Sequence, residues 1–459
     1  MSVAARPLAP TAPRPAARLE ALFDPGTFQP VRSAVESVAM GERAKPGDGV
    51  AAGIGRVAGR TVVAYAQDNQ WLGGSLGPVQ ADTIVRALEI AGRAKAPVVG
   101  FIASGGARMQ EGTAALDGYA RIFSAIVGLS GVVPQISVVC GTSAGGASYA
   151  PALTDWVVMT REASMFLTGP GVVRDVLGEE VTQAELGGPA VQGANGVAHF
   201  SAPGDTEAAA VVRALLSLLR EGQVDPVPAA AADPGAPVPA DPRKVYDIRD
   251  ALRGIVDRYS LLEYAPRWAR NVVCGLARVQ GRSVGVIANQ PRYLGGVLDA
   301  QTAQKAAGFV DRCDAAGVPL LVVVDTPGFM PGLRQERAGV IRYGAGLLRA
   351  FSAATVPKVS VVLRKAYGGA YITMNSKGLG ADLALAWPGA EIGIMGAKPA
   401  VDVVHRREPA EARVDLAAAY AEQHLSAAAA ARGGWVDEVI APAETRARVA
   451  WAFDALAAE

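Results

Sequence analysis

Residues 133–147 read VPQISVVCGTSAGGA, and residues 356–370 read VPKVSVVLRKAYGGA. In both stretches a Val-Pro pair precedes an apolar run, and the segment closes on Gly-Gly-Ala. A continuous apolar run bounded by turn residues is typical of a strand that is buried in a parallel sheet. Because the stretches match at an offset of 223 in a chain of 459, they predict an α/β protein made from two copies of one unit by internal duplication.

The repeat continues on the amino-terminal side of these strands, where Gly73-Gly74 matches Gly295-Gly296 at an offset of 222. Residues 53–68 and 274–290 each alternate apolar and polar side chains around a Gly-containing turn, which predicts a hairpin. Apolar residues then recur at intervals of three and four over 81–95 and 299–316, which predicts amphipathic helices. Further buried strands and helices follow in the same order in both halves. This alternation predicts a mainly parallel sheet with helices on both faces.

Two segments rich in Ala and Pro mark the predicted domain boundaries. Residues 223–242 are rich in Ala and Pro and lack periodicity, so we expect an extended linker there. Residues 1–20 are Ala-, Pro- and Arg-rich, and we expect a disordered tail. The predicted domains are therefore 21–222 and 243–459.

Several classes of protein are disfavoured by composition. A net charge of +1 argues against a nucleic-acid partner, and no apolar run is long enough for a membrane-spanning helix. The three cysteines lie too far apart for a zinc motif or a disulfide framework, so we expect no metal and a cytoplasmic protein. The sequence contains no phosphate-binding loop motif, and no serine-nucleophile motif stands beside any of its three histidines.

The two Gly-Gly-Ala turns are the candidate sites of chemistry. A strand that ends at Gly-Gly and passes into a helix leaves backbone N–H groups without intrahelical partners. Such donors stabilise a developing oxyanion, and glycine lets a substrate approach the backbone closely. An equally simple interpretation is that these glycines only allow a tight strand-to-helix crossing. The duplication favours the first interpretation without excluding the second.

Longer motifs surround these turns and include LEALFDPGTF (19–28), SGGARMQEG (104–112), AGGASYAPALTD (144–155), VDTPGFMPG (324–332) and AWPGAEIGIMGA (386–397). Through these motifs, from about Arg18 to Val449, the sequence resembles the carboxyltransferase (β) subunit of biotin-dependent acyl-CoA carboxylases of the acetyl/propionyl-CoA type. The resemblance implies two tandem domains of the crotonase (ClpP/crotonase) fold. It also implies a homo-hexamer, with the active site between the first domain of one subunit and the second domain of another.

The resemblance also implies residue roles. Gly145 and Gly146 would hold the thioester oxygen of acyl-CoA as an enolate, and Gly369 and Ala370 would hold the ureido oxygen of carboxybiotin. Carboxybiotin would release CO2, its ring would take the α-proton, and the enolate would capture the CO2. Tyr371 and Ile372 would line the substrate pocket. Other turn residues expected to bind the cofactor are Gly105, Gly106, Ala107, Gly328 and Gly368.

The chain itself has no Met-Lys-Met biotinylation motif, so a partner with biotin carboxylase and biotin carrier functions is implied. The expected acceptor is a short acyl-CoA, acetyl-CoA or propionyl-CoA. A non-standard acceptor, a biotin-dependent decarboxylase and an inactive complex-forming paralogue remain as alternatives. Gln192, Pro399 and the pair Leu425-Ser426 depart from the family pattern, and the altered loop around Gln192 motivates the first two alternatives. Arg108 is either a contact for CoA phosphates or an anchor for a neighbouring carboxylate.

Overall fold

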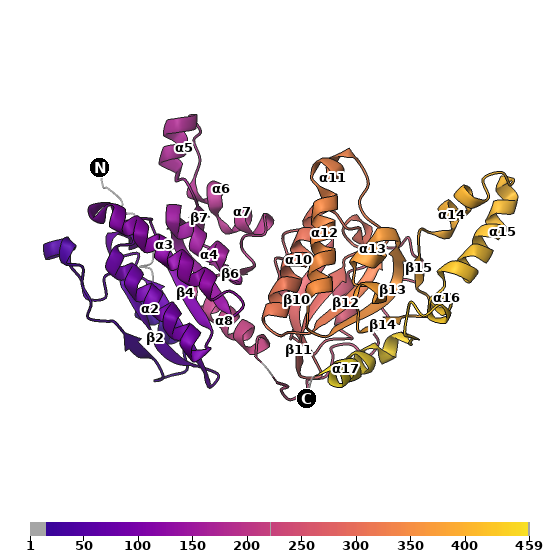
Figure 1. Ribbon diagram of the computed structural model, residues 1–459, viewed down its shortest axis with the longest axis horizontal. Coiled ribbons are helices and arrows are strands. Elements are labelled where there is room, and N and C mark those ends of the chain that lie inside the picture. Colours follow the sequence, from indigo (N-terminus) through magenta and orange to yellow (C-terminus); the bar gives the residue numbers. More distant parts are fainter. Residues whose placement is uncertain (1–14, 221, 458–459) are drawn as a thin grey trace, which may run out of the picture. The chain divides into compact units, whose positions relative to one another are not determined.

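The computed structural model describes residues 15–220 and 222–457. The chain divides into two compact units between Ser217 and Leu218, close to the boundary predicted after residue 222. Each unit carries one eight-stranded sheet (Figure 1). The predicted hairpins, helices and buried strands are present in both units, so the prediction of an α/β fold with a repeated unit is confirmed.

The sheet of the first unit has the strand order β1-β2-β3-β4-β5-β6-β8, with β7 paired to β5. The pairs β1–β2 and β2–β3 are antiparallel, and the pairs from β3 onward are parallel. The strands are β1 (Gln29–Val31), β2 (Val50–Val57), β3 (Arg60–Gln67), β4 (Val98–Ser104), β5 (Gln135–Ala144), β6 (Trp156–Thr160), β7 (Ser164–Phe166) and β8 (Phe200–Ala202). The helices are α1 (Pro15–Leu22), α2 (Pro78–Ala94), α3 (Thr113–Gly128), α4 (Tyr149–Leu153), α5 (Pro170–Leu177), α6 (Gln183–Gly187), α7 (Pro189–Ala194) and α8 (Asp205–Leu218), with short turns η1 (Val38–Arg43), η2 (Leu72–Gly74), η3 (Met109–Glu111) and η4 (Gly145–Ser148).

The sheet of the second unit repeats this topology in the order β16-β14-β13-β12-β11-β10-β9, with β15 paired to β13. The strands are β9 (Leu262–Tyr264), β10 (Val272–Val279), β11 (Arg282–Asn289), β12 (Leu320–Thr326), β13 (Lys358–Tyr367), β14 (Leu383–Ala386), β15 (Glu391–Gly393) and β16 (Glu438–Val439). The helices are α9 (Ile248–Leu252), α10 (Ala300–Ala315), α11 (Leu333–Arg337), α12 (Val340–Ala353), α13 (Gly368–Thr373), α14 (Ala397–Val404), α15 (Ala410–Tyr420), α16 (Ala427–Arg432) and α17 (Thr445–Leu456), with short turns η5 (Leu294–Gly296), η6 (Lys377–Leu379), η7 (Ala421–Leu425) and η8 (Pro442–Glu444).

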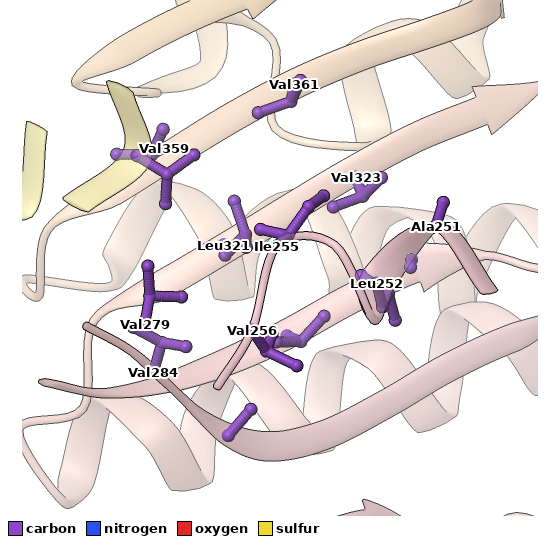
Figure 2. Close-up of a cluster of buried hydrophobic side chains, with 14 of the residues drawn as sticks. Ala251, Leu252, Ile255, Val256, Val279, Val284, Leu321, Val323, Val359 and Val361 are labelled. Carbon is purple, nitrogen blue, oxygen red and sulfur yellow. The ribbon is translucent and has the colours of Figure 1, made fainter. Parts of the chain in front are cut away.

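Apolar side chains fill both faces of each sheet. Every residue of β4 and of β12 is buried, as the continuous apolar runs predict. Figure 2 shows one such core in the second unit, where Leu252 and Ile255 pack with Leu321 and Val359 of the sheet. Burial of this kind is the main favourable contribution to folding.

A carboxylate fastens the hairpin of the first unit to its helices. Asp24 accepts hydrogen bonds from the backbone amides of Ala58 and Gly59 at 3.1 and 3.0 Å. The guanidinium of Arg213, in α8, donates to the same carboxylate at 2.8 Å. These bonds tie the loop after α1 to the β2–β3 turn.

In the second unit an equivalent carboxylate joins the hairpin turn to a helix. Asp257 accepts from the amides of Gln280 and Gly281 at 2.8 and 2.9 Å, and from Arg446 of α17 at 2.7 Å. Asp24 and Asp257 match at an offset of 233 rather than 222, so the offset changes between α1 and the hairpin. The structural repeat therefore begins at α1 and α9, earlier than the sequence pattern that revealed it.

The predicted disordered tail is wrong for residues 15–20, which belong to α1. Arg18 and Leu19 are fully buried, and the Arg18 guanidinium donates to Asp205 at 2.7 Å and to the carbonyl oxygen of Gln67 at 3.0 Å. Ala- and Pro-rich composition concealed the helix because tertiary contacts, rather than local propensity, hold such a short segment. Residues 1–14 of the predicted tail lie outside the described residues.

The Ala- and Pro-rich stretch 223–242 connects the units, but it packs onto the second unit instead of running as a free extended connector. The amides of Ala230 and Ala231 donate to the carbonyl oxygen of Arg253 at 2.9 and 3.1 Å. A Cβ atom added to Gly235 would meet Pro442 at 2.6 Å, which shows how closely the two segments approach. Composition missed this because the partners are distant in sequence.

Candidate active site

The two predicted Gly-Gly-Ala turns have the same backbone in both units. Gly145 follows β5 with φ at +58°, and Gly368 follows β13 with φ at +56°. This left-handed conformation strains any residue with a Cβ atom, so glycine is required at both positions. Each glycine opens a helical turn, η4 in the first unit and α13 in the second, at the carboxyl end of a parallel strand. Ligands bind at this edge of open α/β sheets.

The second glycine of each turn has a different environment in the two units. A Cβ atom on Gly146 would lie 3.0 Å from the ring of Tyr119, whereas one on Gly369 would lie 3.9 Å from Phe329. Glycine is therefore needed at position 146 for packing against Tyr119 as well as for the approach of a ligand to the backbone amide. Gly369 is exposed and has more open space around its Cα atom, whereas Ala370 beside it is fully buried.

The turn after the neighbouring strand lies beside each Gly-Gly-Ala turn. Gly106 accepts a hydrogen bond from the amide of Leu76 at 2.9 Å, and Gly328 accepts one from Leu298 at 3.0 Å. Gly105, in the same turn, donates to a carbonyl oxygen of η2, and Ala107 forms a parallel bridge with Leu76. These predicted cofactor-binding residues thus sit at the sheet edge that carries the glycine turns.

A cavity of about 680 Å³ opens beside Gly368 and Gly369 in the second unit. A second cavity, of about 560 Å³, lies on the other side of α13 against the apolar face of α12. Gly369 and Ile372 line both cavities, and Tyr371 lines the larger one. The larger cavity is also lined by Ile392, Gly393, Ile394, Tyr420, Gln423, His424, Leu425, Ala429, Arg432 and Trp435.

Tyrosine hydroxyls close to the larger cavity keep their protons. Burial raises the pKa of Tyr371 and of Tyr367. Tyr367 donates to Glu391, and Tyr371 donates to the carbonyl oxygen of Trp435 at 3.5 Å. Both groups are hydrogen-bond donors at neutral pH, and neither is a base.

Comparison with known proteins identifies the family. Residues 14–459 match the carboxyl transferase domain family. The methylmalonyl-CoA carboxyltransferase 12S subunit of Propionibacterium freudenreichii subsp. shermanii is 44% identical over 95% of this chain and 87% of its own length. The propionyl-CoA carboxylase beta chain of Saccharopolyspora erythraea is 43% identical over 96% of this chain and 87% of its own length. A crystal structure of the transcarboxylase 12S hexamer with hydrolysed methylmalonyl-CoA superposes with a TM-score of 0.93 at 43% identity, covering 97% of this chain and 90% of that one.

This chain belongs to the carboxyl transferase family. It is an enzyme of that class, and its two units are tandem crotonase-like domains. The predictions of fold, family and enzyme class are confirmed.

Sequence reasoning missed one wall of the larger cavity in this carboxyl transferase. Tyr420, His424 and Arg432 come from α15, η7 and α16. The rings of Tyr420 and His424 are 4.8 Å apart, and η7 is a π-helical turn, a feature frequent at functional sites. The departure from the family pattern at Leu425 was the only nearby signal in the sequence, because these residues reach the cavity only after the chain has folded.

Arg108 of the carboxyl transferase is an anchor for carboxylates rather than an exposed cation. Its side chain is fully buried and donates to Asp48 and Glu111, each at 2.8 Å. The guanidinium also lies 4.5 Å from the centre of the Trp71 ring. This arrangement supports the structural interpretation of Arg108.

Among the described residues, no group of three or more His, Cys, Asp or Glu side chains is placed to hold a metal ion. Within residues 15–220 and 222–457, no helix is both long enough and apolar enough to cross a membrane. The cysteines Cys140, Cys274 and Cys313 are all free.

Proposed function

We propose that this carboxyl transferase moves a carboxyl group between carboxybiotin, carried on a partner protein, and the α-carbon of a short acyl-CoA. The names of its relatives favour propionyl-CoA and methylmalonyl-CoA as the acceptor and product, with acetyl-CoA and malonyl-CoA next. The observation that supports this function most strongly is the duplicated turn. Each unit presents a left-handed glycine and a following backbone amide at the carboxyl end of a buried strand.

In this proposal Gly145 and Gly146 form the acyl-CoA oxyanion site. Their amides begin η4 and have no intrahelical acceptor, so they are free to stabilise negative charge on a thioester oxygen. Backbone donors in a fixed position need no reorganisation when the charge develops. Loss of one donor of this kind typically raises the barrier by about 2.7–4 kcal/mol.

Gly369 and Ala370 form the second oxyanion site, for the ureido oxygen of carboxybiotin. The wall of the cavity fits a fused, mostly apolar ring system, because it combines Ile392, Ile394 and Leu425 with the exposed backbone at Gly369. Carboxybiotin supplies the carboxyl group and, once this has left, a basic ring nitrogen. The role of the chain is to position the ring and the thioester and to exclude water.

Gly105, Gly106, Ala107 and Gly328 are proposed as further contacts for the two ligands, since they lie at the same sheet edges. Tyr371 and Ile372 are proposed to shape the acyl pocket. An apolar wall discriminates one methylene group by only about 1–3 kcal/mol, so we expect Ile372 to accept both acetyl and propionyl groups.

We also propose the setting of the enzyme. A partner with biotin carboxylase and carrier functions supplies carboxybiotin, and six copies of the chain assemble, by analogy with the transcarboxylase 12S hexamer. The proposal also keeps the two predicted domains, 21–222 and 243–459, joined by residues 223–242. It places the enzyme in the cytoplasm, and the three free cysteines support that location.

The reverse direction is a second candidate. A relative 43% identical over 96% of this chain and 89% of its own length is the methylmalonyl-CoA decarboxylase subunit alpha of Propionigenium modestum. Backbone stabilisation of an enolate serves loss of a carboxyl group as well as its gain, so both directions use the same site.

An assay with purified protein tests both candidates. The chain is incubated with a carboxybiotin-loaded carrier and a panel of acyl-CoAs, and separately with biotin and methylmalonyl-CoA or malonyl-CoA. We expect carboxylated propionyl-CoA at the highest kcat/KM. If no acyl-CoA gains a carboxyl group and neither dicarboxylic thioester loses one, the proposed function is wrong.

A further inference from the structure

A buried ion pair joins the carboxyl ends of β12 and β13. The Arg364 Nε atom donates to Asp325 Oδ2 at 2.8 Å, and the two side chains are 7% and 0% exposed. Asp325 stands shortly before the turn that contains Gly328, and Arg364 stands shortly before Gly368. The pair therefore lies at the base of both turns that border the cavities of the second unit.

The same guanidinium also holds the end of the connecting stretch between the units. Its Nη1 atom lies within hydrogen-bond distance of three carbonyl oxygens, those of Pro239 (3.3 Å), Asp241 (3.2 Å) and Lys244 (3.0 Å). One side chain thus contacts a carboxylate on the sheet and three carbonyl groups on residues 239–244. Breaking such a buried pair leaves an uncompensated charge, so its contacts are strongly coupled.

Two further bonds join residues 239–246 to the same strand ends. The hydroxyl of Tyr246 donates to Asp325 Oδ2 at 3.0 Å, and the Tyr246 ring lies 4.7 Å from the Arg364 guanidinium. The Lys365 Nζ atom donates to the carbonyl oxygen of Pro242 at 3.0 Å. We call residues 239–246 the brace segment.

The two positions of the first unit that are equivalent to this ion pair carry no charged side chain. Ala103 stands at the position equivalent to Asp325, and Gly141 stands at the position equivalent to Arg364. A Cβ atom on Gly141 would lie 3.0 Å from the Cβ atom of Ala103, so these two positions are closely packed and neither carries a charged side chain. The shared fold therefore does not require the pair, and its role belongs to the second unit alone.

We propose that Asp325 and Arg364 are positioning residues, which clamp the brace segment beneath the turns at Gly328 and Gly369 and fix the second oxyanion site. This inference rests on the proposed function for the site, but the clamp itself does not. The clamp acts through the backbone of β12 and β13, since neither side chain is among the residues that line the two cavities beside α13. A displacement of about 1 Å at a reacting centre lowers turnover by up to about a hundredfold.

The test compares three variants with the wild-type protein. Asp325→Ala and Arg364→Gly in one chain install the pair that the first unit carries, and they remove both charges together. Arg364→Lys keeps a charge but cannot contact the carboxylate and three carbonyl groups at once. The matched control is Arg446→Gln, because Arg446 makes a similar clamp to Asp257 and to the carbonyl oxygens of Val227 and Ile255, away from the turns.

Limited trypsin digestion reports on the clamp without any need for activity. Arg243 and Lys244 are exposed cleavage sites within the brace segment, and Arg406 and Arg407 are exposed reference sites elsewhere in the second unit. We expect the double variant and Arg364→Lys to be cut after Arg243 and Lys244 about tenfold faster than wild type, with unchanged cutting at the reference sites. The Arg446→Gln variant should keep the wild-type rate at the brace segment.

Steady-state kinetics report on the positioning. We expect kcat for carboxyl transfer to fall by about tenfold to a hundredfold in both clamp variants, with KM for acyl-CoA within about twofold of wild type. If the double variant is cut after Arg243 and Lys244 at the wild-type rate, the clamp is wrong. If its kcat equals that of the wild-type protein, the positioning role is wrong. If the wild-type protein itself transfers no carboxyl group, the proposed function fails while the digestion result still decides the clamp.

Discussion

At the scale of single residues, the two glycine turns differ more than their sequences suggest. Gly145 and Gly368 share a left-handed backbone, but the next glycine is crowded by Tyr119 in one unit and open to a cavity in the other. A substitution at Gly146 therefore disturbs packing and chemistry together. Gly369 is the position at which the two effects separate.

Replacement of Gly369 by Ala should lower turnover without unfolding the protein. The new Cβ atom would be 3.9 Å from Phe329, which is ordinary van der Waals contact, and would project beside the proposed oxyanion donor. The backbone N–H remains, but we expect the added methyl group to keep the ligand oxygen away from it and to lower kcat by about a hundredfold, as loss of one oxyanion donor does. Carboxyl transfer kinetics and urea unfolding, measured together, check this.

The control is Gly346→Ala in α12, where an added Cβ atom meets nothing within 4 Å. It should leave kcat unchanged and stabilise the helix by about 0.5–1 kcal/mol. Full turnover in a folded Gly369→Ala variant would remove Gly369 from the oxyanion site.

Replacement of Arg108 by Met, the residue at the equivalent position 330, should destabilise the first unit. The change leaves the buried carboxylates of Asp48 and Glu111 without their cation. Removing one partner of a buried pair costs about 3–5 kcal/mol, which urea denaturation will measure. The same substitution at Arg121, whose side chain is 40% exposed, is the control. Its pairs with Asp82 and Asp117 lie at the surface and should contribute only about 0–1 kcal/mol. Equal losses in the two variants would contradict the anchoring role of Arg108.

At the scale of elements, each unit begins with a short helix that local propensity does not explain. Leu19, Leu22 and Phe23 of the first unit match Leu252, Ile255 and Val256 of the second at a constant offset of 233, and all six are buried. An apolar pattern before an Asp marks both segments. The helices are held by burial and by the carboxylate that follows them, Asp24 or Asp257.

The Asp24 carboxylate makes the stability of the first unit sensitive to acid. The Gly59 amide, and next the Arg213 guanidinium, lower the pKa of Asp24 below its ordinary value of 3.8. A lowered pKa in the folded state contributes stability above pH 3.8, and this contribution disappears as the pH falls through the folded pKa. Asp24→Asn should therefore lower the urea midpoint at pH 7 and approach the wild-type midpoint below pH 3.8. A constant difference between the two proteins at all pH values would contradict this role.

At the scale of the whole molecule, the chain is a duplicated unit whose copies have diverged at their strand ends. The second copy carries the Asp325–Arg364 pair, and its helices α14 and α15 stand away from the sheet (Figure 1). Val403 and Val404 of α14 are 67% and 66% exposed, and adjacent exposed apolar side chains can mark an interaction surface. The proposed hexamer would cover them with a second copy.

Native mass spectrometry tests this assembly. We expect a species of six times the 47.1 kDa chain mass at micromolar concentration. Val404→Asp should shift the distribution towards smaller species, because burying an unpaired carboxylate at an interface is unfavourable. Val404→Ala, which adds no charge, should retain the hexamer. A wild-type chain that remains monomeric would contradict the proposed assembly.

The sequence alone determined the duplicated α/β architecture, the elements around each Gly-Gly-Ala turn and the family, because apolar periodicity and turn glycines are local signals. It did not determine α1, the docking of the linker stretch 223–242 or the buried state of Arg108. Those depend on partners far away in the chain, such as Asp205 for Arg18 and Asp48 for Arg108. Only the tertiary structure brought His424 and Arg432 to the cavity beside Gly369, and only it distinguished a crowded glycine from an open one. The physical reason is that periodicity records which face of an element is buried, whereas the neighbours that cover that face are set by how the elements pack.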